Sequence, residues 1–364
     1  MKSEGRPFLE FFLLKDVRTF LRRAMLVSRF VPVFPMDSEF RPSRAEALKS
    51  SSVMALFGIC YFSSLYWLLE FDRFFRNEYN RKIQAAELVL LGTCIVLCFV
   101  FYLKNGKLYC RTVEAMRGVD AELTRKGEAV SYNCLPVVLS NCCLLLFVVL
   151  LLTPLIWGWM SSCDSSGVVA DMIITVVTVI FSNCLACPIS SCLTLLNSQF
   201  GHARRVLVSM KNSASPLLIG VEDVERVEGL MQVHGMLCDI AYELNAAMGL
   251  QLLIMAFYID VVVITTLYLI FTTLLTTPDA CSVFSLVCNS FWVVQWVYQL
   301  FYIVFLSTST VKQENLLLHI TMRREAHFSA SGLFPVDYSL IHSMAASATT
   351  YLVILIQFDQ GTAT

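Results

Sequence analysis

The chain alternates between long apolar runs and shorter polar stretches. An α-helix needs about 20 consecutive apolar residues to cross the hydrocarbon core of a bilayer. Runs of that length recur along the chain, with few or no charged residues in each. The pattern therefore predicts seven membrane-spanning helices, near residues 50–69, 84–103, 134–160, 172–197, 249–275, 283–307 and 339–358.

Two of these runs carry an acidic residue. Glu87 lies close to the start of the second span, and Asp260 lies near the middle of the fifth. Both runs are counted as spans, because the loops around them are clearly polar. An ionised carboxylate facing lipid is unfavourable by several kcal/mol. Asp260 is therefore expected to be protonated, to face a hydrated cavity, or to accept hydrogen bonds from neighbouring helices.

Basic residues fall mainly on one side of the predicted spans. Of the 27 Lys and Arg residues, 23 lie in the N-terminal segment and in the loops after spans two, four and six. The other four lie in the first loop. Because basic segments stay in the cytoplasm during insertion, the N-terminus is predicted to be cytoplasmic and the C-terminus external. This orientation is inverted relative to a G-protein-coupled receptor.

The polar segments complete the predicted domain organisation. Residues 1–49 mix apolar clusters with basic residues and prolines, which indicates a cytoplasmic segment with a short interfacial helix. Residues 50–358 form the seven-span domain, and 359–364 form an external tail. Within that domain, the stretches 198–248 and 308–330 are predicted to extend spans as amphipathic helices below the membrane. Their apolar faces need partners, so a cytoplasmic helical anchor domain is expected.

Composition excludes several classes of protein. With 57% hydrophobic and 15% charged residues and a mean hydropathy of +0.66, the chain is not an ordinary soluble domain. Its net charge of -1 gives no sign of a nucleic-acid partner. The sequence contains no P-loop, dinucleotide glycine fingerprint, His-Glu-x-x-His or Gly-x-Ser-x-Gly motif. No enzymatic activity, cofactor or metal site is therefore predicted.

Most of the 14 cysteines fall inside spans, where a thiol behaves as a small hydrophobe. Cys163 and Cys281 are exceptions, because both lie in short external loops. In that oxidising compartment they are candidates for a disulfide that ties span three to the connection between spans five and six. Cys184 and Cys187 have the spacing of a metal or redox pair, but their apolar helix favours simple packing.

Two sets of polar residues inside spans are candidates for ligand binding. Asp260 is one, either in a hydrated ligand pocket or as a hydrogen-bonded packing residue. The other set follows three- and four-residue spacing along span six and combines aromatic rings with amides, which would suit a polar or aromatic small molecule. Interhelical packing with amide hydrogen bonds is the alternative for the same set. Its members are Trp292, Gln295, Trp296 and Gln299.

The last span carries a stripe of distinctive residues on one helix face. Thr350, Tyr351, Ile354, Gln357 and Phe358 follow an i, i+3, i+4, i+7 pattern. Thr-Tyr, five aliphatic residues and Gln-Phe stand in that order. This motif, together with the preceding Ser-Gly-Leu-Phe-Pro-Val-Asp at 331–337, resembles the insect gustatory receptor family.

The resemblance implies a tetramer in which the last helix of each subunit lines one central pore. It also implies that the cytoplasmic anchor domain holds most intersubunit contacts, and that Gln357 and Phe358 form the narrow gate. Asp359 follows directly, and four copies at the external mouth would concentrate cations. The resemblance further implies a ligand-gated, non-selective cation channel, in the plasma membrane of chemosensory neurons, opened by an external small-molecule tastant. The partners implied are membrane lipid and either identical or related receptor subunits.

Leu352 separates this chain from one branch of that family. The main sugar-sensing branch looks to have Glu directly after Thr-Tyr, where this chain has Leu352. A fructose-type sugar, a bitter compound or another contact cue stays open as the ligand. A seven-helix chemoreceptor that signals through a cytoplasmic partner, or a transporter, is the alternative function. A transporter predicts internal repeats and broken helices in matching halves, which the sequence does not display.

Overall fold

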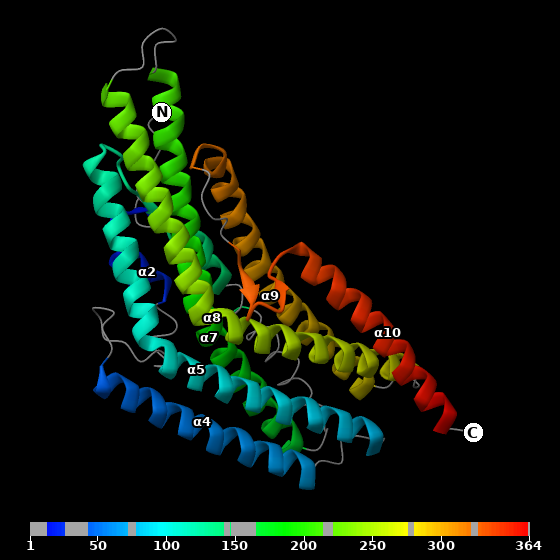
Figure 1. Cartoon of the computed structure of the whole chain (residues 1–364). Helices are drawn as coiled ribbons and strands as arrows, with labels where there is room; N and C mark the ends of the chain where they lie inside the picture. Colours follow the sequence, from blue (N-terminus) through cyan, green and yellow to red (C-terminus); the bar gives the residue numbers. More distant parts are fainter. Residues whose placement is uncertain are drawn as a thin grey trace, which may run out of the picture.

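The computed structural model describes residues 13–25, 43–71, 78–141, 146, 165–213, 221–275, 280–321 and 327–362. These residues are almost entirely α-helical, and long helices run side by side (Figure 1). The predicted all-α class is confirmed. The helices are α2 (Val17–Ala24), α4 (Arg44–Phe71), α5 (Glu78–Arg125), α7 (Ser165–Ser213), α8 (Val221–Leu275), α9 (Ala280–Thr321) and α10 (Tyr338–Thr362).

Six helices in the described part of the chain are long and apolar enough to cross a membrane. They are α4, α5, α7, α8, α9 and α10, and each contains one of the predicted spans. Of the remaining predicted span, 134–160, the structure describes only 134–141 and 146, and 135–141 are helical. The rest of that span lies outside the described residues.

Several helices are much longer than a membrane is thick. α5 has 48 residues and α8 has 55, so at about 1.5 Å per residue they are roughly 70 and 80 Å long. The hydrocarbon core is only about 30 Å thick. Figure 1 shows α5 and α8 changing direction part-way along, which divides the molecule into two helical regions. We call the region with the C-terminal end of α5 and the N-terminal half of α8 the anchor bundle.

The N-terminal helix α2 packs into the anchor bundle against α5 and α7. Asp16 begins the helix, because its carboxylate accepts a hydrogen bond from the Thr19 backbone N–H at 3.2 Å. Val17, Phe20 and Leu21 are fully buried. Just before α2, strand β1 (Leu13–Leu14) pairs antiparallel with β2 (Tyr132–Asn133). The N-terminal segment thus contributes to the core of the anchor bundle.

A buried polar network also holds the anchor bundle together. Gln199 of α7 donates from Nε2 to the Asp120 carboxylate of α5 and to the Met116 carbonyl oxygen, both at 2.8 Å. The Tyr132 hydroxyl donates to the same carboxylate. Burial, together with the negative charge of Asp120, raises the pKa of the Tyr132 hydroxyl, so Tyr132 stays a donor. These bonds join α5, α7 and the segment after α5.

Candidate functional site

The aromatic and amide residues of span six form one buried face of α9. Trp296 is 2% exposed and Gln295 is fully buried. The rings of Trp292 and Trp296 meet edge to face with centroids 5.7 Å apart. Tyr258 of α8 packs edge to face on Trp296 at 4.8 Å.

Glu87 of α5 joins this group. It is only 5% exposed, and its carboxylate accepts hydrogen bonds from Thr265 Oγ1 of α8 at 2.6 Å and from Trp292 Nε1 of α9 at 3.1 Å. Glu87 is not among the site residues predicted from the sequence. An acidic residue within an otherwise apolar membrane-spanning run is itself a sign of a functional site, and this sign could have identified Glu87. The structure therefore connects three helices through one buried carboxylate.

Several polar atoms around this carboxylate are buried without a hydrogen-bond partner in the described part of the chain. They are both amide atoms of Gln295, the indole Nε1 of Trp296 and the Tyr258 hydroxyl. Gln299 donates from Nε2 to the Ser182 carbonyl oxygen of α7 at 3.3 Å, and its Oε1 belongs to the same set. Buried polar groups are normally hydrogen-bonded, so these atoms mark this face of α9 as a candidate site for polar groups of a small molecule. We call Glu87, Tyr258, Trp292, Gln295 and Trp296 the polar cluster.

Asp260 does not share the environment of the polar cluster. Tyr258 faces Trp296, and Asp260 lies two residues further along α8, which turns its side chain by about 200° around the helix. Its carboxylate accepts a hydrogen bond from Ser347 Oγ of α10 at 3.0 Å. Asp260 therefore joins α8 to the last helix.

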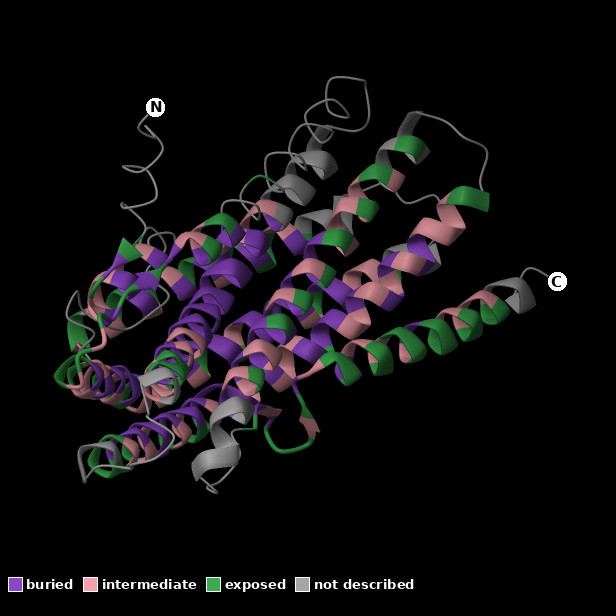
Figure 2. Cartoon of the chain, turned by 90° about the horizontal axis from the view of Figure 1, so that it is seen from above, coloured by how far each residue is buried: buried purple, intermediate pink, exposed green. Residues whose placement is uncertain are grey.

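The last helix, α10, packs on α8 and α9 with one face and is otherwise uncovered. Leu340 and Ala348 are buried on the packed face. In contrast, Thr350 and Gln357 are exposed. Figure 2 shows α10 projecting from the bundle with mostly exposed residues along its C-terminal part. The exposed apolar residues of the motif are Tyr351 at 55%, Ile354 at 38% and Phe358 at 66%.

Asp359 lies on the helical backbone of α10, but its side chain is outside the described set. The same holds for both cysteines of the proposed external disulfide. Cys163 lies outside the described residues, and only the backbone of Cys281 is described, in the first turn of α9. Cys184 and Cys187 are 2% and 3% exposed in α7. Their burial fits the packing role that the sequence favoured for them.

A short hairpin leads into α10 and is attached to α8. Its strands are β3 (Ser329–Ala330) and β4 (Phe334–Pro335). Asn245 of α8 accepts a hydrogen bond from the Ser329 backbone N–H at 2.8 Å. A Cβ atom on Gly249 would lie 3.1 Å from the backbone nitrogen of Ser331, so the close approach of hairpin and helix favours glycine there. The start of α10 is thereby positioned by α8.

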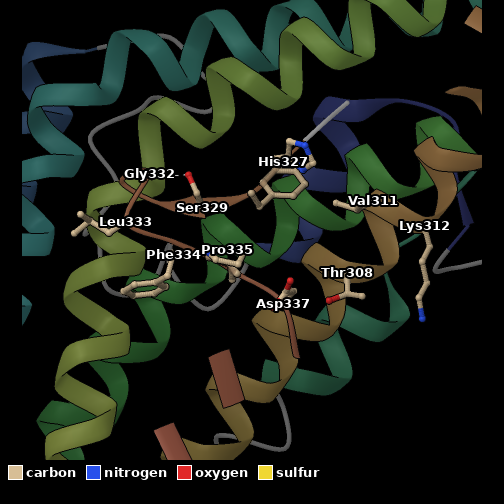
Figure 3. A pocket seen from close by; sticks show the side chains of 12 residues that line it. Thr308, Val311, Lys312, His327, Ser329, Gly332, Leu333, Phe334, Pro335 and Asp337 are labelled. Carbon is tan, nitrogen blue, oxygen red and sulfur yellow. Dashed lines mark hydrogen bonds between the residues drawn. The ribbon is translucent and has the colours of Figure 1, made fainter. Parts of the chain in front are cut away.

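A cavity of about 540 Å³ lies between this hairpin and α9. Figure 3 shows the hairpin residues on one side and the α9 residues Thr308 and Val311 on the other. The candidate pore and ligand-binding residues predicted from the sequence do not line it, but residues 332–337 of the family motif do. The cavity lies at the entry to α10, far along α9 from the polar cluster.

The chain resembles known receptors over most of its length. A family model described as the 7tm chemosensory receptor matches residues 21–323 and 312–362. A stretch of 43 residues is 44% identical to a Drosophila melanogaster protein named "Putative gustatory receptor 2a"; it covers 12% of this chain and 10% of that protein. The chain thus matches about a tenth of the length of that curated relative.

Two solved structures share the fold. Both are of the insect olfactory receptor OR5 from Machilis hrabei, one in complex with eugenol, and both are 11% identical to this chain. The TM-scores are 0.62 with eugenol and 0.60 without, and the match covers 94% of this chain and 98% of the OR5 chain. The likeness confirms an all-α membrane fold.

Proposed function

Because the chain belongs to the 7tm chemosensory receptor family, we propose that it is a gustatory receptor that acts as a ligand-gated, non-selective cation channel. The observation that carries this proposal is α10. It is an apolar helix of membrane length whose motif residues, Thr350, Tyr351, Gln357 and Phe358 among them, are exposed in the single chain. A helix of this kind needs lipid or other subunits against its open face.

Four subunits around one axis would place this face along a central pore. Phe358 would then form a ring of phenyl groups that closes the pore by dewetting, and Gln357 a ring of amides next to it. Asp359 would attract cations at the external mouth. The subunits are identical chains or related receptors, and the channel lies in the plasma membrane of chemosensory neurons. A disulfide between Cys163 and Cys281 stays part of the proposal.

The polar cluster is the proposed binding site for the tastant. Its tryptophan and tyrosine rings offer flat contact surfaces, and its unpartnered amide and indole groups can orient a polar ligand. The Glu87 carboxylate is an acceptor, so it favours a ligand with hydrogen-bond donors, such as a protonated amine. Leu352 after the Thr-Tyr pair supports a ligand outside the main sugar branch.

Helix α8 connects the proposed site to the proposed pore. It contributes Tyr258 and Thr265 to the site, and it holds α10 through the bond between Asp260 and Ser347. It also holds the hairpin that starts α10 through Asn245. A ligand that moves α8 relative to α5 and α9 therefore moves the pore helix.

Recording currents from the purified protein in a planar bilayer tests the proposal. With a panel of amines, other bitter compounds and fructose, we expect cation current on ligand addition with no other protein present. Binding without current, with activity restored by a cytoplasmic extract, would indicate a receptor that signals through a partner. Ligand flux without channel openings would indicate a transporter.

A further inference from the structure

Three side chains that commonly bind metal ions meet inside the anchor bundle. His234 and Cys238 lie one turn apart on α8, and Glu314 lies on α9. His234 and Glu314 are completely buried, and Cys238 is partly buried. Each offers one ligand atom, and these atoms all lie within 4.8 Å of one another. The polar cluster lies further along α8 and α9, and the motif lies on α10.

Two of the three separations between the ligand atoms are close to those around a tetrahedral metal ion. His234 Nε2 lies 3.7 Å from Cys238 Sγ and 3.9 Å from Glu314 Oε1. Zinc binds nitrogen and oxygen at about 2.0–2.2 Å and sulfur at about 2.3 Å, so tetrahedral neighbours lie roughly 3.4–3.6 Å apart. Side-chain shifts of a few tenths of an ångström would bring His234 Nε2 within this range of both Cys238 Sγ and Glu314 Oε1.

We propose that His234, Cys238 and Glu314 bind one divalent transition-metal ion that joins α8 to α9. A mixed set of imidazole, thiolate and carboxylate ligands fits Zn²⁺, which accepts nitrogen, sulfur and oxygen donors. Three side chains leave a fourth position for water. No spacing along the chain marks this site, since Glu314 lies on a different helix from the other two ligands.

Electrostatics supports a cation at this position. A positive charge beside it stabilises a carboxylate that is buried away from water, and Glu314 is completely buried. A metal ion bound to both His234 and Glu314 would neutralise this carboxylate. The predicted cytoplasmic location keeps Cys238 reduced and available as a ligand.

The neighbouring helix α7 fixes the imidazole orientation. The ring of Phe200 packs edge to face on His234 with centroids 6.1 Å apart. Ligands that are held in place before binding lose less conformational freedom when the metal enters. A metal ion here would link the anchor ends of the two helices that also form the polar cluster.

The test uses the full chain, purified in detergent with a tag that contains no histidine. We expect about one zinc ion per chain by elemental mass spectrometry. Added Co²⁺ should give a thiolate-to-cobalt charge-transfer band. Zn²⁺ should displace the Co²⁺ and remove this band. Cys238→Ser should abolish this band and weaken zinc binding by at least about tenfold. Cys110→Ser, which removes a partly buried thiol of α5, is the matched control and should keep both signals.

Glu314→Gln should keep the thiolate band but lower the affinity for Co²⁺. Alkylation tests the site in the unmodified protein, so this measurement does not require any variant to fold. Micromolar Zn²⁺ should protect Cys238, but not Cys110, from N-ethylmaleimide, as measured by peptide mass spectrometry. Zinc uptake only at millimolar concentration, a band that persists in Cys238→Ser, or equal alkylation with and without zinc would each overturn the site.

Discussion

Helices α7 and α10 are both of membrane length, yet they are buried to very different extents. Of the residues in the most apolar stretch of α7, 83% are buried within the chain, against 11% in α10. Their apolar residues therefore act differently. Those of α7 fill the core of one subunit, whereas those of α10 are left for lipid or for another chain. The difference separates residues that hold the fold from residues that are available for a pore.

The largest effect on folding is expected from α7. Leu196→Ala removes a fully buried side chain and should lower the free energy of unfolding by about 2–5 kcal/mol, because it leaves a cavity. Leu355→Ala, in the half-buried part of α10, is the matched substitution. It should shift the thermal unfolding temperature in detergent much less. Equal shifts would mean that α10 is packed as deeply as α7.

The largest effect on current is expected from α10. Phe358→Ala removes the proposed hydrophobic ring, so the channel should conduct without ligand, with a baseline current roughly tenfold above the unmodified protein. Gln357→Ala should mainly change ion preference. Val353→Ala, at an exposed position of the same helix that does not belong to the stripe of Thr350, Tyr351, Ile354, Gln357 and Phe358, is the control and should behave normally. Unchanged single-channel records for both motif variants would show that α10 does not line the pore.

A smaller effect is expected from Glu87 in the polar cluster. Glu87→Gln keeps the shape of the side chain but replaces one acceptor oxygen by an amide group that donates, so the ligand concentration for half-maximal current should rise about tenfold for amine ligands. Surface expression should stay normal. Glu114→Gln, at an exposed position further along α5, should change neither quantity. If Glu87→Gln also responds normally to every active ligand, the carboxylate serves packing alone.

The bond between α8 and α10 should have a modest effect on gating. Asp260→Asn and Ser347→Ala each remove or weaken the 3.0 Å hydrogen bond, so each should change ligand sensitivity by a few-fold. The double variant should be no worse than the stronger single variant, because both changes act on one interaction. Additive effects in dose–response curves would separate the two residues.

The smallest effect is expected at the external mouth. Asp359→Asn removes a charge that the proposed tetramer repeats around the pore, so cation conductance should fall slightly. The loss should be largest at low ionic strength, where the Debye length is about 30 Å at 0.01 M salt. Single-channel conductance measured across a salt series would reveal it. A loss that is independent of salt would exclude an electrostatic cause.

Properties that depend on neighbouring residues in the chain could be predicted from the sequence. The lengths of the apolar runs predicted six helices that the structure describes. Whether a helix can cross a membrane depends on the hydrophobicity of its own residues and on the rise per residue, both of which are local properties. Helical spacing alone predicted that the motif residues of α10 share one face, and these residues are exposed in the structure. The family signature lay in the same short stretch.

Properties that depend on contacts between distant segments required the tertiary structure. Trp292 and Glu87 are 205 residues apart in the chain, and Thr265 and Glu87 are 178 apart. Spacing along one helix therefore identified Trp292 but not its carboxylate partner. Asp260 was a separate candidate because of its acidic side chain in span five, and packing places its carboxylate against Ser347 of α10. Helix periodicity determines which side chains share a face, and only the packing of helices decides what that face meets.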